Sequence, residues 1–157
     1  MKKVLPAVIM FVICFLFIVP VCAQDKPVDT NELLKDKIRT DKKLVVAEDM
    51  QFTEAEAKVF WPVYEGYQKG QAKLYERAKN LVAEYAKNYQ TMTDTMAKKL
   101  LNDFMRIESD RLKLKKKYLP EFRKVLSEKK VARYYQLENK IDAIVNYEVA
   151  KVIPLVK

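Results

Sequence analysis

The chain has no histidine, and its two cysteines, Cys14 and Cys22, both lie near the N-terminus. It also has only two glycines, Gly66 and Gly70, and only two serines. Without histidine the chain lacks the commonest general base and zinc ligand, and it cannot form a Ser-His or Cys-His nucleophile pair. Two isolated glycines cannot build a phosphate-binding loop. We therefore expect a protein that is not an enzyme and that binds no cofactor or metal.

The first residues have the three parts of a secretory signal peptide. Lys2 and Lys3 give a positive start, an apolar run follows over 4–19, and the chain turns polar at Gln24, just after the compact residues 21–23. The run is about 16 residues long, whereas a membrane-spanning helix needs ~20. The pattern predicts cleavage after Ala23 and a periplasmic protein. Acylation of Cys22 is the weaker alternative, because residues 19–21 match a lipobox poorly.

Removal of residues 1–23 leaves 134 residues with 28 lysines and arginines and 21 acids, a net charge of +7 and no thiol. This length fits one domain with a real core. We expect a flexible lead-in over 24–30 and a single helical domain over 31–157. A basic chain raises the question of nucleic acid, but export argues against it. Anionic lipid, envelope polyanions and acidic protein segments are the partners that the charge favours.

Apolar residues recur in steps of three and four, which predicts helices over 31–47, 54–89, 94–126 and 128–150. Three of these helices start with an apolar residue, a hydroxyl residue and an acid, so that Thr53, Thr93 and Ser127 become N-caps. Glu56 completes a capping box with Thr53.

The fold class is therefore all-α, with four helices. The second and third helices are expected to form a long antiparallel hairpin that turns near residue 91. Pro62 and Pro120 lie inside these helices and should bend them. A thin, bent hairpin leaves apolar surface uncovered, so we expect a cradle-like homodimer.

A basic strip on the third helix is the first candidate binding surface. Few acids stand at pairing distance in the sequence; Asp110 to Lys113 and Glu121 to Lys124 are the obvious pairs. An unneutralised strip attracts acidic partners at long range, although an ordinary solvated face explains the same pattern. Its members are Lys98, Lys99, Arg106, Arg111, Lys113, Lys115, Lys116, Lys117, Arg123 and Lys124.

An aromatic group around Pro62 is the second candidate. Phe60 and Tyr64 should share one side of the helix, with Trp61 beside them. They either pack in the core or form the floor of a groove for a flexible apolar client. Glu138 and Asp142, four residues apart, could form a paired-acid site, but we expect them on a solvated face.

The sequence resembles the Spy/CpxP family of exported helical proteins, which carry a repeated Leu-Thr-x-x-Gln motif at helix starts. The matching segments are 52–56 (FTEAE) and 126–130 (LSEKK), which keep the apolar and hydroxyl positions and lack the glutamine. The resemblance covers the chain beyond the signal peptide. It implies an ATP-independent periplasmic chaperone or stress accessory, a cradle-like antiparallel dimer, and a basic, partly apolar face that holds unfolded or partly folded clients.

Two alternatives stay open at this stage. The chain could be an adaptor or inhibitor that docks onto one envelope protein without chaperone activity. It could also be a peripheral binder of anionic lipid, using the basic strip and the apolar tail over 153–156.

Overall fold

The computed structural model describes residues 41–156. The chain divides into two units, Met1–Lys37 and Ile38–Lys157, and every described residue belongs to the second. The predicted signal peptide, the lead-in over 24–30 and the start of the first predicted helix lie outside the described residues. Within residues 41–156, no helix combines the length and apolarity that crossing a membrane requires.

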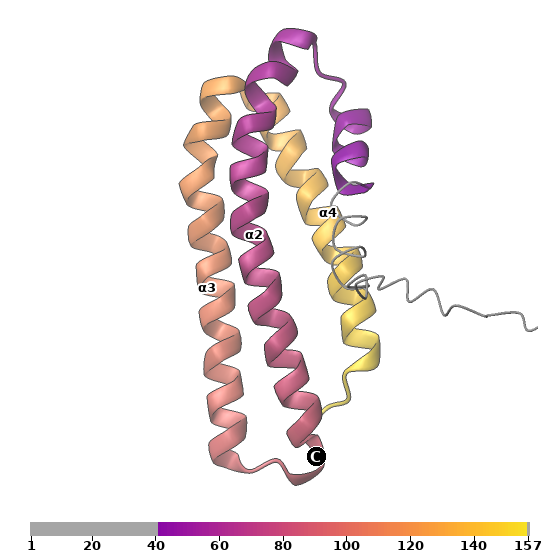
Figure 1. Ribbon diagram of the computed structural model, residues 1–157, viewed down its shortest axis with the longest axis vertical. Coiled ribbons are helices and arrows are strands. Elements are labelled where there is room, and N and C mark those ends of the chain that lie inside the picture. The colour runs from indigo at the N-terminus through magenta and orange to yellow at the C-terminus, as the bar shows by residue number, and fades with distance from the viewer. Residues whose placement is uncertain (1–40, 157) are drawn as a thin grey trace, which may run out of the picture. The chain divides into compact units, whose positions relative to one another are not determined.

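The described chain is all-helical (Figure 1). Residues 41–50 are helical and precede α2 (Glu54–Asn88), the short 3-10 helix η1 (Tyr89–Thr91), α3 (Asp94–Val125) and α4 (Glu128–Val152). Helices α2 and α3 run antiparallel and side by side, and η1 lies in the turn between them. The prediction of an all-α protein with four helices and a long hairpin is confirmed. The first helix ends at residue 50 instead of 47.

Local hydrogen bonds explain where each long helix begins. The Thr53 hydroxyl accepts from the backbone N–H of Glu56, and the Glu56 carboxylate accepts from the backbone N–H of Thr53, which closes the predicted capping box. Thr93 and Ser127 accept in the same way from residues 96 and 130. Each cap satisfies an amide group that has no partner within its own helix. All three predicted caps are confirmed.

The two glycines and two prolines all lie inside helices. Both helices continue across their prolines, and the bends expected at Pro62 and Pro120 stay a prediction. Gly66 and Gly70 face α3. A Cβ atom on Gly66 would lie 3.0 Å from the Tyr118 hydroxyl, and one on Gly70 would lie 2.7 Å from a Leu114 methyl carbon. Because they have no side chain, the two glycines let α2 and α3 approach closely. Their role is therefore in helix packing.

The core is an aromatic cluster in which α2, α3, α4 and residues 41–50 meet. Phe60, Tyr67, Phe122 and Tyr134 each have no exposed surface. The ring centres of Phe122 and Tyr134 are 4.7 Å apart, and those of Phe60 and Tyr134, which pack edge to face, are 5.3 Å apart. Such tilted arrangements suit the ring quadrupoles. Beyond Asp142, residues 143–152 of α4 are all exposed, so the core lies at one end of the hairpin.

Candidate functional site

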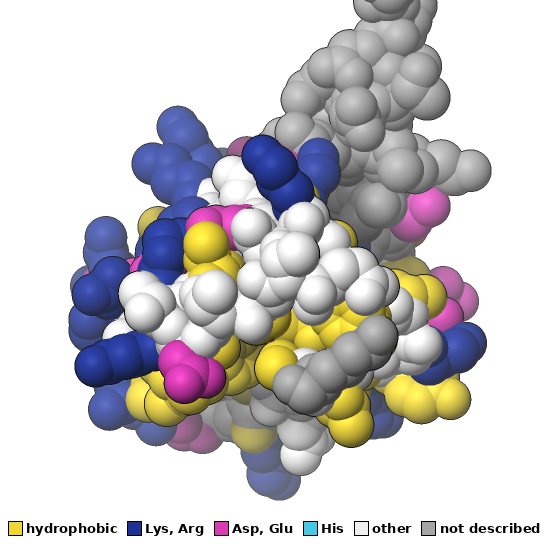
Figure 2. Space-filling model, turned by 90° about the horizontal axis from the view of Figure 1, so that it is seen from below, with side chains coloured by type: hydrophobic (Ala, Val, Ile, Leu, Met, Phe, Trp, Pro, Cys, Tyr) yellow, Lys and Arg dark blue, Asp and Glu magenta, His cyan; other side chains and the backbone are white. Residues whose placement is uncertain are grey.

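The basic strip divides between two sides of α3. Eight of its ten residues are exposed: Lys98, Lys99, Arg106, Lys113, Lys116, Lys117, Arg123 and Lys124. The other two, Arg111 and Lys115, are half-buried and face inward. The Arg111 guanidinium lies 5.4 Å from the Tyr75 ring centre, and Lys115 donates to the Asn139 side chain at 3.0 Å. Figure 2 shows lysines and arginines gathered on the side of the molecule that α3 forms.

The expectation of an unneutralised strip is wrong. Ion pairs join Lys99 to Glu84 at 2.6 Å, Arg106 to Asp103 at 3.1 Å and Arg123 to Glu128 at 3.0 Å. The two pairs read from the sequence, Lys113 with Asp110 and Lys124 with Glu121, are also present. The pairs of Lys99 and Arg123 could not be read from α3 alone, because Glu84 comes from α2 and Glu128 from α4, whereas Arg106 and Asp103 are three residues apart and could have been paired from the sequence. Within the basic strip, Lys98, Lys116 and Lys117 have no acidic partner among the described residues.

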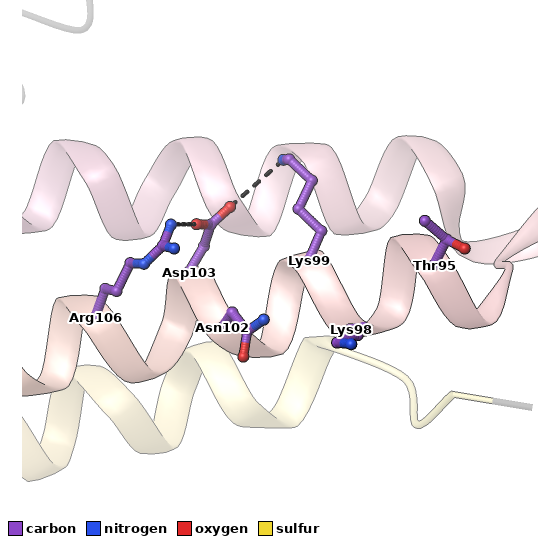
Figure 3. Close-up of a pocket in the computed structure, with 6 residues that line it drawn as sticks. All are labelled: Thr95, Lys98, Lys99, Asn102, Asp103 and Arg106. Atoms are coloured by element: carbon purple, nitrogen blue, oxygen red, sulfur yellow. Dashed lines mark hydrogen bonds and ion pairs between the residues drawn. The ribbon is translucent and has the colours of Figure 1, made fainter.

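A shallow, open depression lies at the N-terminal end of this face (Figure 3). All of its lining residues belong to α3: Thr95, Lys98, Lys99, Asn102, Asp103 and Arg106. Figure 3 shows Asp103 between Lys99 and Arg106, with an ion pair to each. The lining of the depression is polar, and its one acidic side chain, Asp103, already forms ion pairs with Lys99 and Arg106. We therefore describe the depression as part of the polar helix surface.

An apolar stripe runs beside the lysines on α3. Leu101, Phe104, Met105 and Leu112 are between 48% and 62% exposed. Their spacing of three, one and seven residues places them on one side of the helix. We call this stripe, together with the neighbouring Lys98 and Lys116, the α3 face. Leu101, Phe104 and Leu112 belong to the apolar spacing that predicted the helix over 94–126, but α3 buries Leu100, Ile107 and Phe122 instead.

Of the two alternatives for the aromatic group, core packing is the one that Phe60 and Tyr64 adopt, and the exposed groove floor is wrong for them. Phe60 is 0% and Tyr64 2% exposed, and only Trp61 keeps partial exposure. The Lys43 ammonium group lies 4.9 Å from the Trp61 ring centre. Residues 41–50 are the reason for the burial, since Val46 and Met50 belong to the same core cluster.

A polar seam crosses the interior between α2 and α4. It consists of Gln68, Gln71 and Tyr75 on α2 with Glu138 and Asp142 on α4. Glu138 is 0% and Asp142 7% exposed, so the expectation of a solvated pair is wrong. Glu138 accepts from Lys42 at 2.8 Å and from Gln68 at 3.1 Å, and Tyr75 donates to Asp142 at 2.5 Å.

Burial changes the acid–base behaviour of the seam. Burial raises the pKa of Glu138 above its ordinary value of 4.5, against the opposing pull of the Lys42 charge. Burial and the hydrogen bond to Asp142 raise the pKa of Tyr75. One Gln71 oxygen and one Asp142 oxygen are buried without a hydrogen-bond partner in the structure. Within residues 41–156, no three acidic side chains converge as a metal site would require.

Comparison of the chain with protein-family models, with curated proteins and with solved structures finds no match. The resemblance to the Spy/CpxP family therefore stays a prediction.

Proposed function

We propose that this protein is an ATP-independent periplasmic chaperone or envelope-stress accessory that holds unfolded or partly folded proteins on the α3 face. The observation that carries the proposal is the apolar stripe of Leu101, Phe104, Met105 and Leu112 beside two lysines, Lys98 and Lys116, that have no acidic partner among the described residues. Exposed apolar side chains gathered on one face are typical of protein-binding surfaces.

The α3 face supports broad and reversible binding. Lys98 and Lys116 attract acidic client segments over about 10 Å at moderate ionic strength. The stripe then contacts apolar client side chains, without a deep pocket that would select one sequence. Holding is passive in this proposal, since Gly66 and Gly70 lie inside α2 and supply no phosphate-binding loop. The proposal includes a homodimer, whose mass sedimentation equilibrium would measure.

The test is light scattering from a chemically unfolded, aggregation-prone protein diluted into buffer with and without this protein, at low and high salt. We expect suppression near equal molar ratio that weakens with salt. Two α3-face variants should both lose suppression: Lys98→Glu with Lys116→Glu, and Leu101→Asn with Met105→Asn. Lys129→Glu and Leu155→Asn are matched controls, because these exposed residues lie outside α3.

Two outcomes would overturn the proposal. One is a folded protein that suppresses no aggregation at any ratio. The other is suppression that the α3-face variants and the controls change equally. Co-sedimentation with anionic phospholipid vesicles, in place of suppression, would favour the peripheral lipid binder. A single tight envelope partner would favour the adaptor.

A further inference from the structure

Residues 41–50 form a small cover over the aromatic core. Val46 and Met50, one helical turn apart, are 0% and 2% exposed, whereas Leu44 and Val45 are 63% and 45% exposed. The two buried side chains join a cluster that includes Phe60 and Tyr64 of α2 and Tyr134 of α4. We call these three rings the aromatic seat. In Figure 1, residues 41–50 lie beside the N-terminal half of α4.

Charged contacts fix the direction of the cover on the seat. At its N-terminal end, Lys42 pairs with Glu138 at 2.8 Å and Lys43 pairs with Glu65 at 2.9 Å. At its C-terminal end, Asp49 pairs with Arg133 at 2.8 Å. The seat is therefore set up for a specific pattern: two apolar residues four apart, lysines one turn before the first, and an acid just before the second.

The charged contacts between the cover and the other described residues are mostly weak. Two of these three ion pairs are largely solvent-exposed, and such pairs contribute little. Gln51 has a φ of +44°, a left-handed conformation that ends the helix and separates it from α2. In contrast, the caps of α2 and α3 and the packing between these two helices involve no residue of 41–50. The cover can thus open as a unit.

We propose that the aromatic seat is a binding site for amphipathic helical segments of client proteins, with which residues 41–50 compete. The inference rests on the proposed function, and it adds a second site to the α3 face. The α3 face meets clients by charge and exposed apolar contact, and the seat accepts a segment with the pattern that the cover itself displays. The cover keeps the rings of the seat out of water between clients.

The test uses a fluorescein-labelled peptide with the sequence of residues 41–52 as the client probe. A control peptide carries Val46→Asp and Met50→Asp. Fluorescence anisotropy measures binding to the full chain with Cys14→Ser and Cys22→Ser, so that introduced cysteines are the only thiols. In this background, Lys43→Cys with Glu65→Cys is joined by a short bis-maleimide, which locks the cover. The same variant treated with a monofunctional maleimide is the unlinked control.

Locking the cover should reduce peptide binding at least tenfold relative to the unlinked control, and the control peptide should bind neither form. A matched cross-link between Arg77→Cys and Asp110→Cys, which replaces an α2–α3 ion pair of 2.8 Å, should leave binding unchanged. Equal binding to the locked and unlinked proteins would overturn the proposal. Covalent dimers as the main product of the Lys43–Glu65 link would assign the seat to a second copy, and would overturn it too.

Hydrogen exchange provides a measurement that needs no ligand. In the unaltered chain, amides of residues 46–50 should exchange through an opening that occurs at least tenfold more often than the opening of the α2–α3 hairpin. The Lys43–Glu65 link should remove this difference. Equal opening of the cover and the hairpin would show that the cover does not leave independently, and would refute the competition.

The two proposals fail in distinguishable ways. If the protein suppresses no aggregation but binds the peptide only when unlocked, the proposed function fails and the seat stands. If locked and unlinked proteins suppress aggregation equally and bind the peptide equally, the seat fails and the α3 face remains the client surface.

Discussion

Removing one hydroxyl group from the polar seam should destabilise the protein more than its size suggests. Tyr75 donates to Asp142 at 2.5 Å, and Asp142 is 7% exposed. Its other oxygen has no hydrogen-bond partner in the structure, and the Lys115 ammonium group is 3.7 Å away. The substitution Tyr75→Phe keeps the ring and its packing. It therefore isolates the loss of one donor to a buried carboxylate.

The magnitude follows from the charge and burial of the acceptor. A hydrogen bond to a charged group contributes about 1.5–3 kcal/mol. Water can replace only part of the lost bond at a site this buried, so we expect Tyr75→Phe to lower the free energy of unfolding by about 2–3 kcal/mol. Urea denaturation followed by circular dichroism measures this change, provided that the m-value stays constant.

Tyr85→Phe is the matched control. The Tyr85 hydroxyl donates at 2.7 Å to the Pro154 carbonyl at an exposed position, where water can take its place, so the expected loss is about 0.5 kcal/mol. The double variant Tyr75→Phe with Asp142→Asn should lose less than the sum of its parts, because both changes act on one contact. A Tyr75→Phe loss no larger than the Tyr85→Phe loss would refute the reasoning.

Three further predictions concern stability. Phe122→Ala should cost about 3–5 kcal/mol, because the ring is fully buried, whereas Leu101→Ala should stay within about 0.5 kcal/mol in urea denaturation. Thr53→Ala should lower the free energy of unfolding by about 1 kcal/mol and by more than Thr93→Ala, which breaks a cap without a capping box. Glu138→Gln should flatten the pH dependence: the raised pKa of Glu138 makes the folded state bind its proton more tightly than the unfolded state, so this residue adds stability as the pH falls from 7 toward 4.5. A Glu138→Gln variant with the same slope of stability against pH as the unaltered protein would contradict that sign.

Local patterns made the helices predictable. The capping residues act through hydrogen bonds that span three positions, so Thr53, Thr93 and Ser127 could be identified without knowing the fold. The hairpin could be predicted from the same helix boundaries, since two long helices joined by a short connection pack antiparallel.

Burial was less predictable, because it depends on residues far away in the sequence. Glu138 and Asp142 read as solvated acids, and they are buried because α2 brings Gln68 and Tyr75 to them from 70 and 67 residues away. Leu112 belongs to the apolar spacing of its helix and is nevertheless exposed, because such spacing does not say which neighbouring element covers a given side. Phe60 and Tyr64 left two readings open, and the position of residues 41–50 settles them as core.

The polar seam also restricts how the helices can slide along one another. Apolar side chains fit several registers, so two smooth helices can shift by a turn, about 5.4 Å, at modest cost. Such a shift would carry Asp142 past Tyr75 and Glu138 past Gln68 at once, leaving buried acids without donors. Each of these two hydrogen-bonded pairs thus fixes the register of α2 against α4. A shifted register would break both pairs, so the seam selects one register out of several that the apolar contacts alone would allow.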